Sequence, residues 1–396
     1  MNKVSELTYW DLFPELGTGP IPVDTYISND WYENEITKVF KKCWLHVGRV
    51  DELPEAGSYK VKQLTFAPTS LILTRDNNGK IRAFHNICSH RGNKVISGGE
   101  CVGKARGGGL VCRFHGWVYG MDGRVLSIPE VDRFVGIDPK GLGLSEVHAE
   151  VWEGFIFVNL AETPDSRLAD FLGEAGARFA GFPFGTMTAA YRYRTVLKCN
   201  WKVAQDAFSE GYHVPTIHAG SFPASFDTKL LNVRLYGLHR SAGAFQLMAT
   251  QPKPVAALTY RFANTSVAKP GQRSNLPEAI NPGQNPDFGF DLCVFFPNFL
   301  LHVTEGFYFT HQFWPLSVDE TLWEGVQYFV PPQNAGERFA HEYGQVLQRN
   351  AWLEDTATME DTHEALKSGA RKEIYLQEGE VLIRHHMKVL EDMLRA

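Results

Sequence analysis

Two stretches, Cys88-Ser-His-Arg-Gly92 and Cys112-Arg-Phe-His-Gly-Trp117, decide how this chain folds. Each places one histidine two or three residues after one cysteine, beside a glycine. Zinc fingers usually group like ligands in pairs, Cys with Cys and His with His. A [2Fe-2S] centre with two imidazoles in place of two thiolates takes one ligand of each kind from each loop. The order Cys, His, Cys, His along the chain therefore predicts an iron–sulfur cluster held by Cys88, His90, Cys112 and His115. A structural zinc site, or no metal, are the alternatives.

The sequence around these stretches predicts a small all-β domain. From about residue 44 to 160, short β-branched runs such as Phe155–Asn159 alternate with proline and glycine. Asn78-Gly79 lies between two apolar runs and predicts a hairpin. Both stretches thus lie in loops between strands.

A second group of candidate ligands lies between Asn200 and His218. We expect a helix from Trp201 to His213, ended by Pro215 because proline disfavours a helical predecessor. His213 and His218 can then converge. Two histidines and one carboxylate on one face of Fe(II) leave positions open for O2. The expected helical region from Ala335 to Gly369 can supply the carboxylate; its candidates are Glu354, Asp355 and Asp361.

The combined pattern resembles the Rieske non-heme iron oxygenases, in their terminal oxygenase alpha subunit. CSHRG and CRFHGWVYGMDGRV are similar to the two cluster-binding boxes of Rieske proteins. Asn200-Trp-Lys, Glu210-Gly-Tyr-His213, His218 and Asp355 are similar to the segments that hold the mononuclear iron. The resemblance covers effectively the whole chain. It implies that His213, His218 and Asp355 are the iron ligands, with Asp355 preferred over Glu354 and Asp361.

Glu210 stands three residues before His213, which would place both on the same helical face. There its carboxylate can accept the imidazole N–H and orient the ligand. The resemblance further implies that Glu210 bridges to a cluster histidine of a neighbouring subunit, which by position is His115. A plain ion pair on a helix face is the alternative. Where members of the family often have Glu-Asn-Phe, this chain has Asp206-Ala207-Phe208.

The expected fold class is α+β. We expect residues 1–43 to pack with the catalytic domain, residues 44–160 to form the all-β Rieske domain, and residues 161–396 to form the catalytic domain. The latter would be an antiparallel sheet flanked by helices, of the helix-grip type. Strand-like segments include Asp291–Val303 and Phe307–Pro315, a loop rich in Pro, Asn and Gly runs from Gln251 to Pro286, and Val381–Arg395 closes the chain as a helix.

Composition excludes several classes of protein. The 396 residues carry a net charge of −6, which argues against a generally basic nucleic-acid binder. No apolar run approaches the ~20 residues that span a bilayer, and the first ten residues lack the features of a secretory signal. We therefore expect a cytoplasmic protein without membrane or nucleic-acid partners. Between Arg91 and Arg113, five basic residues stand against one acid; this patch either steers an acidic electron donor or is a solvated loop.

The resemblance implies a terminal oxygenase that uses O2 and electrons relayed from NAD(P)H. The chain has no Gly-x-Gly-x-x-Gly after a strand, so a separate ferredoxin or flavin reductase would supply the electrons. A homotrimer, with or without a β subunit, is expected. The substrate would be a hydrophobic, aromatic compound, as in aromatic hydrocarbon catabolism. The reaction would be either a monooxygenation, which includes N- or O-dealkylation, or a cis-dihydroxylation of a ring. Rings around Phe295–Phe299 would line its pocket, together with Ala207, Phe208, Val214 and Trp352. A Rieske electron carrier without oxygenase activity and a zinc-stabilised binding protein are the alternatives.

Overall fold

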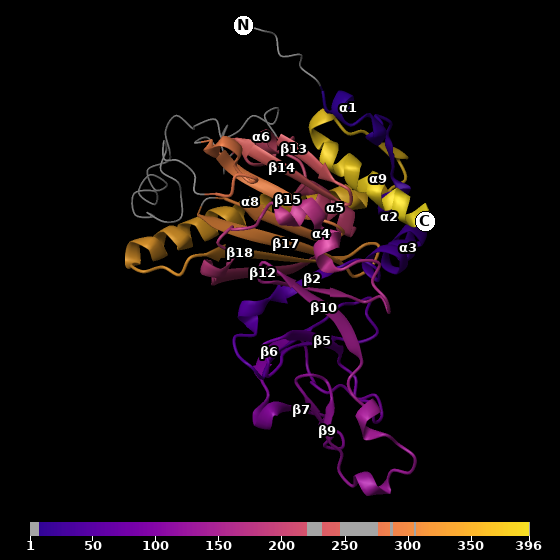
Figure 1. Ribbon diagram of the computed structural model, residues 1–396. Helices are drawn as coiled ribbons and strands as arrows, with labels where there is room; N and C mark the ends of the chain where they lie inside the picture. Colours follow the sequence, from indigo (N-terminus) through magenta and orange to yellow (C-terminus); the bar gives the residue numbers. More distant parts are fainter. Residues whose placement is uncertain (1–7, 220–231, 246–275, 286–287, 305, 396) are drawn as a thin grey trace. The chain divides into compact units, whose positions relative to one another are not determined.

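A computed structural model describes residues 8–219, 232–245, 276–285, 288–304 and 306–395. The chain divides into two compact units, residues 40–171 and residues 1–39 with 172–396 (Figure 1). Most of the expected loop from Gln251 to Pro286 lies outside the described residues.

The unit of residues 40–171 is built on β structure, as predicted. A seven-stranded antiparallel sheet has the order β2-β11-β10-β5-β4-β3-β6, and a three-stranded sheet the order β7-β8-β9. The strands are β2 (Leu45–Arg49), β3 (Ser58–Lys62), β4 (Leu71–Arg75), β5 (Ile81–His85), β6 (Cys101–Lys104), β7 (Gly109–Val111), β8 (Val118–Gly120), β9 (Val125–Ser127), β10 (Glu146–Trp152) and β11 (Phe155–Asn159). The hairpin at Asn78-Gly79 is confirmed: it joins β4 to β5, and Gly79 takes the left-handed conformation, with φ +80°, that this turn requires.

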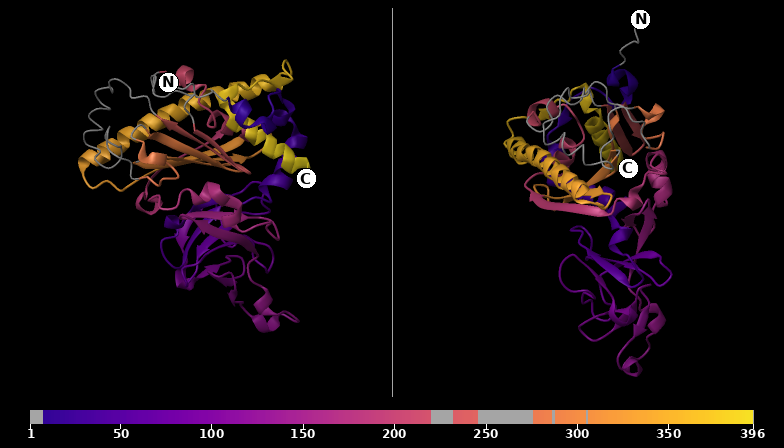
Figure 2. Two further views of the ribbon diagram at one scale, coloured as in Figure 1. Left: turned by 45° about the horizontal axis from the view of Figure 1, so that its top comes forward. Right: turned by 90° about the vertical axis from the view of Figure 1, so that its left-hand side faces the viewer.

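The second unit contains a seven-stranded antiparallel sheet of order β12-β18-β17-β16-β15-β14-β13. Its strands are β12 (Ala189–Leu197), β13 (Asn232–Tyr236), β14 (His239–Phe245), β15 (Phe288–Phe295), β16 (Phe299–Val303), β17 (Phe307–Pro315) and β18 (Thr321–Phe329). The helices are α1 (Tyr9–Leu12), α2 (Asp24–Ile27), α3 (Asn29–Glu35), α4 (Leu168–Ala177), which crosses the boundary between the units, α5 (Trp201–Ala207), α6 (Val214–Ile217), α8 (Ala335–Lys367) and α9 (Val381–Arg395). Figure 2 shows the long helix α8 lying along one face of the sheet. The α+β class and the sheet flanked by helices are thus confirmed.

Two expected elements differ in their bounds. The helix that begins at Trp201 ends at Ala207 rather than at His213. The Ser209 hydroxyl donates to the carbonyl of Gln205 (2.8 Å), which a helical N–H would otherwise use, and side chains of this type compete with the helix in that way. The expected strand Asp291–Val303 is two strands, because the chain turns at Phe296-Pro297.

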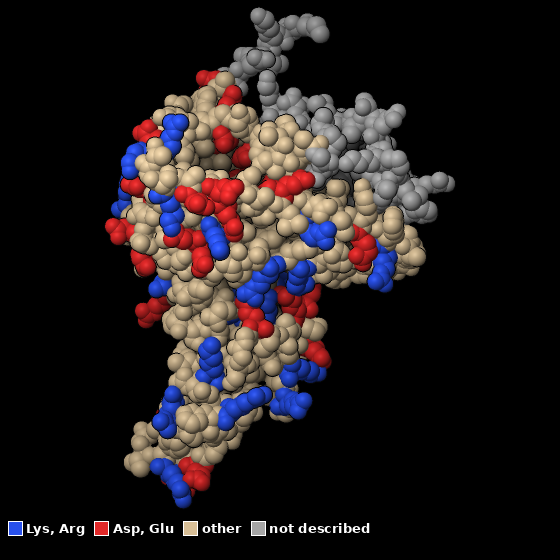
Figure 3. Space-filling view, turned by 180° about the vertical axis from the view of Figure 1, so that it is seen from behind, with Lys and Arg blue, Asp and Glu red and all other residues tan. Residues whose placement is uncertain are grey.

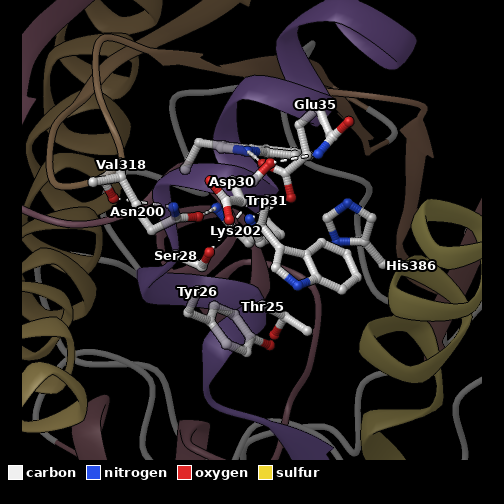
Figure 4. Close-up of polar contacts among 12 residues, drawn as sticks. Thr25, Tyr26, Ser28, Asp30, Trp31, Glu35, Asn200, Lys202, Val318 and His386 are labelled. Carbon is white, nitrogen blue, oxygen red and sulfur yellow. Dashed lines mark hydrogen bonds and ion pairs between the residues drawn. The ribbon is translucent and has the colours of Figure 1, made fainter. Parts of the chain in front are cut away.

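A buried ion pair joins helix α3 to helix α5. The Lys202 ammonium lies 2.5 Å from Glu35 Oε1, and the Trp201 indole N–H donates to Glu35 Oε2 (2.8 Å). At the start of α5, the Asn200 side chain caps the helix and donates to the carbonyl of Val318 (3.0 Å) (Figure 4). Neither Lys202 nor Glu35 is exposed to solvent. These contacts hold α5, and the segment that follows it, against the N-terminal helices.

One transverse row of residues crosses the sheet of the second unit. Cross-strand pairing aligns Leu235, Arg240, Val294, Leu300, His311, Gly325 and Tyr193. Because residues paired across strands point to the same face of a sheet, all seven share one face. His311 contacts Phe208, which follows α5, and Trp352 of α8, so this face is the one that α5 and α8 cover. We call these seven residues the central row.

Candidate functional site

The two Cys/His loops of the first unit have the same backbone geometry. In each, the glycine four residues after the cysteine donates to the cysteine carbonyl at 2.9 Å: Gly92 to Cys88, and Gly116 to Cys112. Both glycines have positive φ, +73° and +75°, which explains why glycine stands there. Two equivalent turns therefore present their thiols and imidazoles from matched positions.

The four candidate cluster ligands are sorted by depth. The Cys88 and Cys112 side chains are buried, His90 is partly buried and His115 is exposed. The rings of His90 and His115 lie 4.5 Å apart, and His90 stacks on Trp117 at 5.1 Å. The thiols therefore lie inside the unit, and the imidazoles face its surface.

Hydrogen-bond donors surround the two sulfur atoms. The Tyr119 hydroxyl lies 3.0 Å from Cys88 Sγ, and Asn93 Nδ2 lies 3.8 Å from Cys112 Sγ. Burial is the largest influence on the pKa of Cys112 and raises it, but the hydrogen bonds to its sulfur, from the backbone N–H of Phe114 and from Cys88, Asn93 and the backbone N–H of His115, together lower the pKa overall. Such donors stabilise thiolate or sulfide charge and tune a cluster's potential.

The arrangement of these ligands also separates a two-iron cluster from a zinc ion. Across the described ranges, one group of three or more His, Cys, Asp or Glu side chains brings its ligand atoms within 4.8 Å of one another, and it lies in the other unit. The Cys88, His90, Cys112 and His115 side chains thus do not converge on one point, as tetrahedral zinc requires. A cluster with its thiolates on one iron and its imidazoles on the other fits this spread.

The basic residues counted between Arg91 and Arg113 are all exposed. They are Arg91, Lys94, Lys104, Arg106 and Arg113. On the face seen in Figure 3, Lys and Arg side chains outnumber acidic ones over this unit. An exposed patch of one sign steers a partner of the opposite sign.

The converging group of the second unit is His213, His218 and Asp355. The two histidines flank the short helix α6, and Asp355 extends from α8. Asp355 Oδ1 lies 2.9 Å from His218 Nε2 and 3.4 Å from His213 Nε2. These three are the residues that the sequence indicated as candidate iron ligands, and the structure brings them together.

Each imidazole of this group is held from behind by a carboxylate. The Nδ1 of His213 contacts Glu210, and the Nδ1 of His218 lies 2.8 Å from Glu354 Oε2. A carboxylate accepts a hydrogen bond, so the proton sits on Nδ1 and the Nε2 lone pair points toward Asp355. Among the described residues, Asp355 Oδ1 has no hydrogen bond of acceptable geometry. Two nitrogen lone pairs and one oxygen directed at a common point fit a divalent iron ion.

The structure places the competing acids differently from Asp355. Glu354 binds the outer nitrogen of His218 and is absent from the converging group. Asp361 is exposed on α8 and is likewise not in that group. Glu210 contacts His213 as expected, but from the turn after α5 and not from a helix face. Burial raises the pKa of the Asp355 carboxyl, as expected for an anion removed from water.

A wall of aromatic rings stands beside the converging group. Phe208 stacks on His311 at 4.4 Å, and Trp352, one helical turn before Asp355, contacts His311 at 4.8 Å and Trp323 at 5.5 Å. Phe309 completes the set at 5.4 Å from Trp352. We call these five residues the aromatic wall.

Not every expected pocket residue belongs to this wall. Phe208 and Trp352 do, whereas Ala207 ends α5 and Val214 begins α6, both partly buried. The expectation for the Phe295–Phe299 segment was wrong for its two end rings, whereas Phe296 contacts His386 of α9 at 6.2 Å. Phe299 pairs with Gln312, the neighbour of His311, so strand alternation turns both end rings of this segment to the opposite face of the sheet. There Phe295 packs on Phe179 at 6.1 Å.

Sequence reasoning missed the buried polar groups behind α5. The Tyr26 hydroxyl donates to Asp206 Oδ2 (2.8 Å), and His386 Nδ1 lies 3.3 Å from Asp206 Oδ1. Burial raises the pKa of Asp206 to about 7, although Tyr26 and the nearby Arg240 oppose the shift. No local motif marks these residues, because Tyr26 and His386 each lie 180 positions from Asp206 in the sequence.

Comparison with known proteins assigns a family to each part of the chain. Residues 43–146 match the Rieske [2Fe-2S] domain, which defines the class of the first unit. Residues 184–396 match the ring hydroxylating alpha subunit (catalytic domain). This second match covers more than half of the chain, which therefore belongs to the ring-hydroxylating alpha-subunit family. A [2Fe-2S] cluster, a mononuclear iron and O2 as co-substrate follow from the two domains.

Individual relatives differ in what they act on. The chain is 28% identical over 342 residues to the glycine betaine monooxygenase oxygenase subunit of Pseudomonas aeruginosa. This alignment covers 78% of this chain and 76% of the relative. It is 32% identical over 209 residues to the biphenyl 2,3-dioxygenase subunit alpha of Rhodococcus jostii. This second alignment covers 50% of this chain and 43% of the relative. Other leading matches likewise span about 44% of the relatives' length. A crystal structure of the quaternary ammonium Rieske monooxygenase CntA shares the fold, with a TM-score of 0.77, 21% identity and 99% of each chain covered. Within the described residues, no helix has the length and apolar character needed to cross a membrane.

Proposed function

We propose that this chain is the terminal component of an oxygenase that hydroxylates a carbon next to nitrogen in a small quaternary ammonium compound. The observation that carries the proposal is the aromatic wall beside His213, His218 and Asp355. The face of a tryptophan or phenylalanine ring attracts a quaternary ammonium group. The betaine-oxidising relative, aligned over most of both chains, supports the same substrate class.

In this proposal each donor set holds one cofactor. Cys88, His90, Cys112 and His115 hold the cluster, and His213, His218 and Asp355 hold the mononuclear iron. When bound, the cluster passes single electrons and the iron activates O2. The chain's own residues orient these ligands: Glu210 and Glu354 fix the imidazoles through Nδ1.

Electrons and subunits complete the proposal. A ferredoxin or flavin reductase with an acidic surface would dock on the exposed basic residues around the cluster loops. The Glu210 carboxylate, which contacts His213 through one oxygen, would contact the exposed His115 of a neighbouring subunit through the other, in a homotrimer. A cytoplasmic location is part of the same proposal.

Oxidation of an arene is the second candidate function. The aromatic wall would pack against a flat hydrocarbon as well as against a cation, and the match to the biphenyl-oxidising relative favours it. The two candidates differ in charge: a cation is attracted by the ring faces and by the buried carboxylates, whereas a hydrocarbon gains only from burial.

Product analysis with labelled O2 tests the proposal. The purified protein, a generic ferredoxin and reductase, and NADPH are incubated with choline, glycine betaine, carnitine, naphthalene and biphenyl. Hydroxylation consumes the substrate, O2, two electrons and two protons, and yields the hydroxylated product and water. The carbon that carries both the new hydroxyl and the nitrogen then loses its C–N bond, which gives an aldehyde, the tertiary amine and a proton. We expect consumption of at least one trimethylammonium compound, with one labelled oxygen in its product after this aldehyde is trapped by reduction. Turnover of the arenes alone, with two labelled atoms, would overturn it.

A further inference from the structure

We propose that Arg240 is an anion-binding residue that receives the carboxylate of a substrate carrying both a quaternary ammonium group and a carboxylate. This inference rests on the proposed function, which it narrows from quaternary ammonium compounds in general to zwitterions of the betaine type.

Arg240 lies on the same face of the sheet as the aromatic wall. It occupies the central row on β14, and His311 of the wall occupies the same row on β17. Three strand spacings of about 4.8 Å separate the two backbone positions, and the arginine side chain covers part of that interval. A molecule lying along the row would therefore meet rings at one end and a guanidinium at the other.

The guanidinium has no hydrogen-bond partner among the described residues. Arg240 is 0% exposed, and its Nε, Nη1 and Nη2 atoms are all buried and unbonded there. A buried charge without hydrogen bonds is costly, so proteins retain one where a ligand completes it. Gln205 of α5 is also 0% exposed, and neither of its side-chain amide atoms has a hydrogen bond among the described residues. It adds a neutral donor on the helix that covers this face.

Among the neighbouring groups that the structure describes, Arg240 is the positive charge left without a paired acid. Lys202 is already paired with Glu35. Burial holds the pKa of His385 at about 3 and that of His386 well below its usual value, so both are neutral. Within the described ranges, the Asp206 carboxylate and the Cys293 thiol act on the charge of Arg240, and the carboxylate is bonded to Tyr26 and His386. Burial raises the pKa of the Cys293 thiol to about 12, so it is neutral. With the pKa of Asp206 raised to about 7, half of that opposing charge is absent at neutral pH.

A purely structural role is the competing explanation, and Arg178 illustrates it. Arg178 is also buried, at 6% exposed, but it is ion-paired with Asp291 on the opposite face of the sheet. Arg178 therefore supplies a matched control: a buried arginine of the same unit whose partner belongs to the protein.

Two substrates that differ in the carboxylate test the inference. Glycine betaine carries the carboxylate, and choline carries a hydroxyl in its place. We expect wild-type protein to favour glycine betaine, and Arg240→Gln to lower the ratio of kcat/KM for glycine betaine to that for choline about 100-fold, the size of a lost charge-assisted bond. Arg178→Gln should leave the ratio within a factor of three of wild type, whatever it does to stability.

The outcomes separate this inference from the proposed function. If wild type oxidises choline as well as glycine betaine, or if Arg240→Gln leaves the ratio unchanged, the carboxylate site is wrong and the proposed function stands. If wild type oxidises no trimethylammonium compound, the proposed function fails; benzoate binding that Arg240→Gln abolishes would then still support the anion site. If Arg240→Gln does not fold, calorimetric titration of wild type with glycine betaine and choline decides, and equal affinities overturn the inference.

Discussion

Replacing Asp206 by asparagine should remove a pH dependence from the stability of the catalytic unit. Asp206 is 7% exposed, and its side chain meets Tyr26 and His386 directly. Arg240, Lys202 and Glu380 act on its charge from the elements around it. Burial is the largest influence and raises the pKa of Asp206 from 3.8 to about 7.

The magnitude follows from this difference in pKa. The folded state binds the proton more tightly than the unfolded state does, so the stabilisation is fully present below pH 3.8 and is lost as the pH rises through about 7. Because the pKa is 3.8 in the unfolded state and about 7 in the folded state, the free energy of unfolding falls by about 3 kcal/mol between pH 5 and pH 8.5. For a unit of this size, that corresponds to roughly 6–12 °C in Tm.

Calorimetric unfolding across this pH range measures the effect. Asparagine keeps the shape of the side chain and cannot ionise, so Tm of Asp206→Asn minus Tm of wild type should be near zero at pH 5 and rise by roughly 6–12 °C at pH 8.5. Asp392→Asn, which changes an exposed carboxylate on α9, should show a flat difference. If the Tm difference between Asp206→Asn and wild type were equally independent of pH, Asp206 would be ionised throughout, and its interactions with neighbouring groups would offset the effect of burial on its pKa.

Three further substitutions test the sites. His213→Ala should keep the visible spectrum of the cluster and lose the mononuclear iron, measured as iron per labile sulfide; loss of the spectrum would contradict the assignment of His213. Glu354→Gln should weaken Fe(II) binding about 10- to 100-fold in an anaerobic titration, because His218 loses the carboxylate that orients it; unchanged affinity would show that Glu354 has no such role. Gly325→Ala would place a Cβ 2.7 Å from a Trp323 ring carbon and 3.2 Å from Trp352, and should destabilise the unit by about 1–3 kcal/mol; a native Tm would show that the aromatic wall is loosely packed.

The candidate ligand residues could be found in the sequence because their spacing reflects local chemistry. A cysteine and a histidine on one tight turn need a glycine at a fixed offset, and both turns show it in the sequence at Gly92 and Gly116. The two histidines around Pro215 are likewise close in sequence. Element types also followed from local patterns, as the hairpin at Asn78-Gly79 and the closing helix Val381–Arg395 show.

The tertiary structure alone decided which distant groups meet. Glu354 and Asp355 are neighbours on α8, and only the rotation of that helix over the sheet directs Asp355 to both Nε2 atoms and Glu354 to the far side of His218. Strand register, set by pairing across the whole sheet, turned the rings of Phe295 and Phe299 away and aligned Arg240 with His311. A shift of one residue in any strand would reverse the face of its side chains. The sequence alone therefore determined the chemistry of the metal ligands, and long-range packing determined the surroundings that a substrate meets.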